Sequence, residues 1–212
     1  MSKTDFKKSM KSLYDPSAQE FSKVNVPILS FLTIDGEGDP NTAGEYRTGV
    51  EWLFGVSYAM KFAAKASLAR DYVVPPLEAL WWADDPKDFV NGTKDRWKWT
   101  IMIMTPEFVP DALFDAAVEK TGKKLGKPPA GLRREAYDEG LSLQILHVGS
   151  YDDEAPTLKR LHEVEMPARN LAFNGPHHEI YLSDPRKVEA SKLRTILRQP
   201  VRPIASPRHP PE

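Results

Sequence analysis

One order of features occurs twice along the chain, and this repeat constrains the fold more than anything else in the sequence. Each copy contains an apolar strand, an acidic turn ending at a proline, a helix, and two strands that each end just before a proline. The copies begin at the strands 28–34 and 141–148. Matching features in a fixed order indicate a duplicated unit. We therefore predict the α+β class, as a tandem β-α-β-β repeat with pseudo-twofold symmetry: an antiparallel sheet with helices, and a ligand cleft between the halves. The alternative is an unrelated pair of α+β subdomains.

Hydrophobic periodicity and prolines set the limits of the expected elements. The first copy has a helix over 45–66 and the strands LEALWW and WKWTIMIM; the second has a shorter helix from Pro156 and the strands HEIYLS and KLRTILR, the last closed by Pro200. A helix over 110–124 and a short helix ending at Gly140 connect the copies. The resulting single domain, 1–204, comprises an amphipathic helical lead-in (1–26), a first repeat (27–106), connecting helices (107–140) and a second repeat (141–204), followed by a disordered tail (205–212).

Composition excludes several classes of function. The 212 residues carry a net charge of −1, which does not fit a nucleic-acid partner, and no apolar run is long enough to span a membrane. Without cysteine there is no thiolate catalysis or thiolate metal site. Phosphate-binding loops and histidine pairs at metal-ligand spacing are absent from the sequence, so we expect neither a cofactor nor a metal. A cytoplasmic location is the default expectation, and the oligomeric state stays open.

The strand HHEIYL is the most informative candidate site. Strand alternation puts His177, Glu179 and Tyr181 on one face, and His178, Ile180 and Leu182 on the other. A carboxylate can act as a general base or hold a cation, and a phenol can donate to a developing oxyanion. On spacing alone, a solvated polar strand face explains the same pattern.

The matching strand of the first copy supplies a second set of candidates. There Glu78, Leu80 and Trp82 share a face, and the predicted symmetry places Trp82 opposite Tyr181. Facing aromatic rings with nearby carboxylates suit a flat or cationic ligand. The other candidate wall residues are Trp52 and Tyr58 on the first helix and Met102 on the WKWTIMIM strand. Each of these also suits an ordinary core, or contact with the lead-in.

Four phrases together resemble the stand-alone GyrI-like small-molecule-binding proteins. They are GVEWLFGVSYAMKF, PPLEALWW, EGLSLQILHVGSYDDEAPT and HHEIYLSDPRK. The resemblance runs from about Pro27 to Pro200 and implies the same tandem architecture with a cleft between halves. Two departures are Pro167, within the expected second helix, and Pro176, directly before the HHEIY motif.

The resemblance also implies an activity. The long stand-alone branch is similar to hydrolases that open the cyclopropane of DNA-alkylating toxins of the yatakemycin and duocarmycin type. By that resemblance Glu179 and Tyr181 are the catalytic residues, and Trp82, Trp52 and Tyr58 form the aromatic wall.

Two other functions stay open. One is a non-catalytic module that sequesters planar or cationic compounds, with Glu179 as counter-ion. The other is a protein-interaction role, such as the topoisomerase inhibition of the namesake members, which predicts an exposed patch outside the cleft.

Overall fold

A computed structural model describes residues 3–85 and 93–204. The strands of the first half are β1 (Lys3–Thr4), β2 (Ser22–Val26), β3 (Leu29–Glu37), β4 (Asp71–Tyr72), β5 (Leu77–Trp82) and β6 (Lys98–Thr105). Those of the second half are β7 (Arg133–Tyr137), β8 (Gly140–Val148), β9 (Leu171–Phe173), β10 (His177–Tyr181) and β11 (Arg194–Pro203). The main helices are α1 (Phe6–Ser9), α2 (Lys11–Tyr14), α3 (Gly44–Ser67), α5 (Asp111–Leu125), α6 (Ala155–Arg160) and α7 (Met166–Ala168), with short helical turns η1 (Lys94–Arg96), η2 (Tyr151–Asp153), η3 (Leu161–Glu165) and η4 (Ala190–Lys192).

The strand order confirms the duplicated unit. The main sheet runs β2-β8-β11-β10-β5-β6-β3-β7, with β9 added beside β11. Outward from the central pair, β5, β6 and β3 on one side match β10, β11 and β8 on the other. The strands of the two units pair antiparallel throughout. The two copies therefore meet along β5 and β10, and the predicted α+β class with an antiparallel sheet and helices is confirmed.

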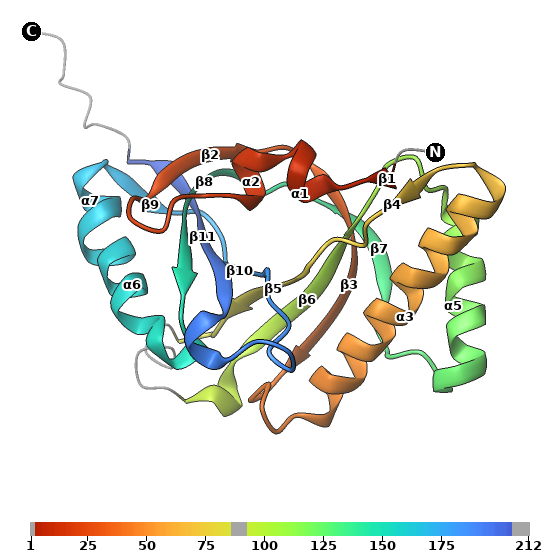
Figure 1. The fold of residues 1–212 in the computed structure, drawn as a ribbon. Helices are drawn as coiled ribbons and strands as arrows, with labels where there is room; N and C mark the ends of the chain where they lie inside the picture. The colour runs from red at the N-terminus through yellow and green to blue at the C-terminus, as the bar shows by residue number, and fades with distance from the viewer. Residues whose placement is uncertain (1–2, 86–92, 205–212) are drawn as a thin grey trace, which may run out of the picture.

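Helices of both copies cover one face of this sheet. Cross-strand pairing puts Ile101, Ala79, Glu179 and Leu197 on a common side. We call this side the helix face, because α3 packs on Ile101 in one half and Leu161 of η3 packs on Leu197 in the other. Figure 1 shows α3 and α5 at the right of the view and α6 and α7 at the left. The seam between the copies thus lies between two helical layers.

The N-terminal segment covers the opposite face, which contains Leu80, His178 and Arg198. Leu13 and Tyr14 of α2 are buried there, against Ile180 and Ile196. We call this side the N-terminal face; α1 and α2 cross the sheet near the top of Figure 1. The N-terminal segment thus covers one face of β10, and on the other face the side chains of His177 and Glu179 are only 10% and 15% exposed, so the alternative of a solvated strand face is wrong.

The long helix was well predicted. Helix α3 spans Gly44–Ser67, against an expected range of 45–66. Its buried residues include Leu53, Met60 and Ala64, which follow helical spacing. Apolar spacing over six turns is a strong signal because every turn repeats it.

Two predictions about the shorter segments are wrong. The expected short helix ending at Gly140 is instead strand β7, which pairs with β3 at the edge of the sheet. Its sequence, RREAY, is polar enough for helix, but long-range pairing decides its conformation. The lead-in is not one amphipathic helix: it contains two single-turn helices, separated at Met10, and the strand β2.

Two prolines that were expected to end an element do not end it. Pro167 does not end the second helix; a π-helical turn, η3, precedes it, and the helix continues through α7. Strand β11 continues past Pro200 to Pro203, since β9 pairs with its last three residues. The carbonyl of Pro200 still accepts a hydrogen bond from the Asn174 amide at 3.0 Å. The predicted disordered tail, 205–212, lies outside the described residues.

Candidate functional site

Three side chains form a hydrogen-bonded row on the helix face at the seam. Trp81 Nε1 donates to the hydroxyl of Tyr181 over 3.1 Å, and that hydroxyl donates to Glu179 Oε2 over 2.7 Å. The side chain of Glu179 is 15% exposed. A short O–H···O⁻ bond is typical of an ionised acceptor. The row joins the two copies, since Trp81 belongs to β5 and the other two residues to β10.

Aromatic rings surround this row from both halves. Tyr46, near the start of α3, stacks on Trp81 with ring centroids 6.0 Å apart and planes 22° apart. Trp97 meets Trp81 edge-on at 5.8 Å. Tyr151 of η2 meets Tyr181 edge-on at 5.7 Å. These rings make a wall suited to a flat apolar ligand.

A second carboxyl group, that of Glu154, lies beside Glu179. Glu154 precedes the first residue of α6 and is 4% exposed, next to Thr195 of β11. Its Oε1 is buried and has no hydrogen-bond partner within the described residues. Burial, together with the negative charge of Glu179, raises the pKa of Glu154 far above its usual range. The charge of Glu179 thus opposes ionisation of Glu154, whereas a hydrogen bond from Glu154 favours ionisation of Glu179.

Burial also shifts the pKa values of the other groups at the site. Burial raises the pKa of Glu179 and outweighs the stabilising hydrogen bond from Tyr181. Burial and the Glu179 charge raise the pKa of Tyr181 well above its normal value. His177 Nε2 lies 3.7 Å from Glu179 Oε1. Burial, with His162 nearby, lowers the pKa of His177 to about 3, so its ring is neutral at pH 7.

The predicted partner of Tyr181 was the wrong tryptophan. Trp82 lies on the N-terminal face, where it packs against the cluster that contains Leu80 and Met102. Trp81 takes the place expected for Trp82. The predicted alignment of the two repeats is one residue out of register, and in a strand a shift of one residue moves every side chain to the other face.

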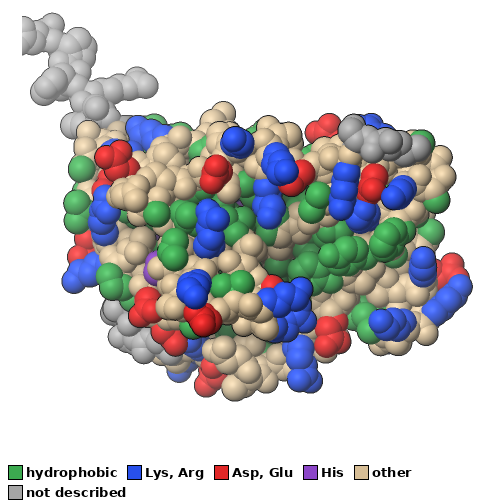
Figure 2. Space-filling model, in the orientation of Figure 1, with side chains coloured by type: hydrophobic (Ala, Val, Ile, Leu, Met, Phe, Trp, Pro, Cys, Tyr) green, Lys and Arg blue, Asp and Glu red, His purple; other side chains and the backbone are tan. Residues whose placement is uncertain are grey.

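Other predicted wall residues also lie away from the row. Met102 is buried on the N-terminal face and Trp52 in the core under α3. Tyr58 is 47% exposed and stacks between Phe54 and Phe62 along the outside of α3. Figure 2 shows hydrophobic side chains gathered alongside this helix. Of the eight predicted site residues, the structure brings together Glu179, Tyr181 and His177.

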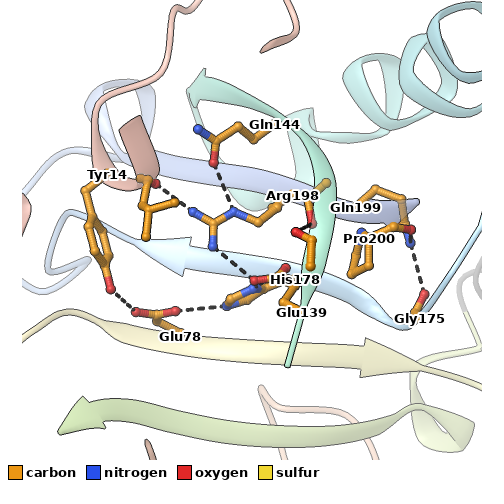
Figure 3. Close-up of polar contacts among 12 residues, drawn as sticks. Tyr14, Glu78, Glu139, Gln144, Gly175, His178, Arg198, Gln199 and Pro200 are labelled. Atoms are coloured by element: carbon orange, nitrogen blue, oxygen red, sulfur yellow. Dashed lines mark hydrogen bonds and ion pairs between the residues drawn. The ribbon is translucent and has the colours of Figure 1, made fainter. Parts of the chain in front are cut away.

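Glu78 belongs to a buried charged cluster on the N-terminal face (Figure 3). It accepts a hydrogen bond from the Tyr14 hydroxyl at 3.0 Å, and its Oε2 lies 3.0 Å from His178 Nε2. The other ring nitrogen of His178 lies 2.9 Å from Glu139, which also pairs with Arg198 at 3.2 Å. Burial alone would lower the pKa of His178, but Glu139 and Glu78 outweigh it and raise that pKa to about 9.

This cluster holds the N-terminal segment in place. Arg198 donates to the carbonyl of Leu13 over 2.6 Å and to the Gln144 side chain over 2.9 Å. Gln144 in turn donates to the carbonyl of Ser12 over 2.6 Å. Two positive and two negative side chains thus balance on this face. Glu78 is structural here, and within the described part of the chain no hydrogen bond or ion pair joins it to the row on the helix face.

Sequence reasoning missed Trp81, Glu154, Tyr46 and Tyr151. The acidic turn GSYDDEAP, which contains both Tyr151 and Glu154, marked the start of the second helix. The helices of the two copies both begin near the seam, so the predicted symmetry could have indicated the first residues of each helix as candidate site residues. The symmetry pointed to this position but not to the side chains that occupy it.

Two surface hollows lie elsewhere. One of about 450 Å³ is lined by Asp111 and Arg134, and one of about 470 Å³ by His147 and Arg160. Neither includes Glu179 or Tyr181. Within residues 3–85 and 93–204, no three His, Cys, Asp or Glu side chains are grouped so that they could hold a metal ion. No helix in the same ranges is both long and apolar enough to cross a membrane.

Solved structures from Listeria innocua are similar over most of the chain. A conserved protein from this organism is 37% identical with a TM-score of 0.84, covering 94% of this chain and 100% of its own. A hydrolase from the same organism is 35% identical with a TM-score of 0.81 and the same coverage. The C-terminal domain of EcmrR, at 10% identity and a TM-score of 0.56, shares the fold. A search of curated proteins returned no match.

A family model agrees with these similarities. The model of the GyrI-like small-molecule-binding domain matches residues 19–202. That range includes both copies of the repeat and every residue of the row at the seam. The chain therefore belongs to the GyrI-like small-molecule-binding family.

Proposed function

We propose that this protein is a hydrolase that opens the cyclopropane of cyclopropanoid genotoxins, with Glu179 activating water and Tyr181 assisting. The observation that carries the proposal is the 2.7 Å hydrogen bond from Tyr181 to Glu179 beneath an aromatic wall. Similarity to hydrolases at 35% identity supports hydrolytic chemistry. The ligand would be planar, because the surrounding groups are rings, and it would be neutral or cationic, because the titratable groups beside it are carboxyls.

The chemistry requires little of the protein. In such compounds the cyclopropane is conjugated to a dienone. A bond forms between the water oxygen and the ring methylene, a ring C–C bond breaks, and its electron pair moves into the new phenolate. Glu179 takes a proton from the attacking water. A buried carboxylate with a raised pKa is a stronger base than one in water.

Tyr181 orients Glu179 and, through its hydrogen bond from Trp81, is itself held in position. The aromatic wall would keep the flat substrate against this row and convert a two-body encounter into a local one. His177, neutral and 3.7 Å from Glu179, packs beside the base without competing for the proton.

The test is turnover of a cyclopropyl-dienone compound in excess over protein, followed as formation of the hydrated phenol. Glu179→Gln should lose about 100- to 10,000-fold in rate, the usual contribution of one positioned base. Glu189→Gln, which alters a carboxylate that is 73% exposed, is the matched control and should behave as wild type. Unchanged turnover in Glu179→Gln would reject the assignment.

A sequestering function is the second candidate, and the aromatic rings around a carboxylate favour it for cations. Stoichiometry separates the two. A sequestering protein removes compound only up to its own concentration, whereas a hydrolase clears an excess. Binding of a planar cation that is lost in Glu179→Gln, with no product formed, would favour sequestration.

A further inference from the structure

The mechanism above leaves one buried acid at the site without a role. Glu154 comes from the turn before α6, yet its carboxyl is near enough to that of Glu179 on β10 for the two to interact electrostatically. It is 4% exposed, and within the described residues it takes part in no ion pair. A buried carboxylate without a cation or full hydrogen bonding is costly. Such a group needs an explanation.

A proton between the two carboxyls provides that explanation. The Oε1 atom of Glu154 has no donor, and the only donor to the side chain of Glu179 with good geometry in the described part of the chain is Tyr181. Two carboxylates in contact cannot both be ionised in a site of low dielectric constant, whereas one shared proton turns their repulsion into a hydrogen bond. The pair then carries one negative charge.

We propose that Glu154 is a catalytic residue, and that it and Glu179 share one proton and together carry out both proton transfers of the ring opening. This inference rests on the proposed function. The ionised carboxyl takes a proton from the attacking water. The protonated carboxyl supplies the proton that ends on the phenol oxygen, directly or through a water molecule. A proton then passes between the two carboxyls and restores the starting state.

The balance closes within the site. One water adds: its oxygen bonds to the ring methylene, and the ring C–C bond breaks. The released electron pair enters the new aromatic ring, and the π electrons of the dienone carbonyl move onto its oxygen, which binds the proton from the pair. One proton enters the pair and one leaves it. No oxidant, reductant or external acid is needed, and apart from the water that adds, the chemical step requires no proton exchange with bulk solvent.

The pair should give a distinctive pH dependence. Its active form has one proton, so rates fall at low pH, where both carboxyls are protonated, and at high pH, where both are ionised. The other titratable or charged groups around the pair are Tyr46 on α3, Tyr151 and Asp152 on η2, His177, His178 and Tyr181 on β10, and Asp184 after it. The tyrosines have raised pKa values and His177 a lowered one, and His178 faces the other side of the sheet.

The kinetic test is the pH profile of kcat/KM on a cyclopropyl-dienone compound. Wild type should give a bell. Glu154→Gln should lose about 100- to 10,000-fold at the optimum and lose the alkaline limb, because only Glu179 then titrates. Glu154→Asp should keep the bell at a reduced rate. A residue that merely supports the fold would lower the rate without removing a limb.

An infrared spectrum tests the shared proton independently of turnover. At neutral pH the wild-type protein should show the carbonyl stretch of a protonated carboxylic acid, and Glu154→Gln should lack it. If Glu179→Gln abolishes turnover while Glu154→Gln keeps the rate and the bell, the inference fails and the proposed function stands. If wild type forms no product, the proposed function fails; the infrared band then decides whether the proton-sharing pair survives, and its absence from wild type overturns the pair.

Discussion

His178 and Glu179 are consecutive residues of β10, and their side chains lie on opposite faces of the sheet in opposite electrostatic surroundings. His178 has carboxylates at 2.9 and 3.0 Å, whereas Glu179 has a hydroxyl donor at 2.7 Å and another carboxyl beside it. One face thus stabilises a positive charge that holds the N-terminal segment. The other retains a carboxyl pair of raised pKa at the seam between the two copies.

Substitutions of the neighbouring residues Trp81 and Trp82 should have different effects, because Trp81 belongs to the candidate site and Trp82 to the core on the other face. Trp81→Phe removes the hydrogen bond to Tyr181 and should reduce turnover about fivefold, the effect of losing roughly 1 kcal/mol of positioning. Trp82→Phe removes contacts on the other face and should lower the melting temperature without changing kcat. Equal kinetic effects in the two variants would contradict the assignment of faces.

Much of this arrangement follows from local sequence. The strands β5 and β10 and the helix α3 have strong periodic signals, and the alternation of β10 placed Glu179 and Tyr181 together. The pairing of Trp81 with Tyr181 could not be predicted, because it depends on the register between strands about 100 residues apart. Glu154 reaches the site only through the packing of α6 over β11, which no local pattern encodes. Edge strand β7 could not be predicted for a related reason. It is held by pairing with β3, as in the ion pair of Arg133 with Asp35, and these two residues are 98 positions apart in the sequence.

The buried histidine should make stability fall with rising pH. Its folded pKa of about 9 exceeds the usual value of 6.5, so the stabilisation is fully present below about 6.5 and is lost as pH rises through about 9. The free energy of unfolding should decrease by about 3 kcal/mol across that window. Urea denaturation at several pH values measures this decrease. His178→Gln should flatten it, and an equally steep decrease in that variant would assign it to other groups.

Arg198 should be among the most sensitive charged residues. Its side chain is 3% exposed, and Arg198→Met would leave Glu139 with a buried charge that is only partly compensated. Breaking a buried pair in this way costs about 3–5 kcal/mol. Adding Glu139→Gln should recover part of the loss. Arg186→Met, which alters an ion pair with an 82% exposed arginine, is the control and should leave the urea midpoint unchanged.

The aromatic wall depends on a glycine that lies outside the site. A Cβ added at Gly36 would lie 2.2–2.7 Å from three ring atoms of Trp99, a fully buried side chain that cannot move aside easily. Trp99 contacts Tyr46 edge-on at 5.1 Å, and Tyr46 stacks on Trp81. Gly36→Ala should therefore cost at least about 1–3 kcal/mol of stability through overpacking, and also reduce binding of a planar ligand.

Gly44→Ala provides the matched control for this glycine. An added Cβ there meets nothing within 4 Å, and alanine favours the helix that begins at this residue, so stability should be unchanged or slightly higher. Thermal melting and ligand titration of the two variants measure both effects. If Gly36→Ala melted and bound like wild type, Trp99 would have room to shift. The contacts that lead from Gly36 through Trp99 and Tyr46 to Trp81 would then not hold the aromatic wall in place.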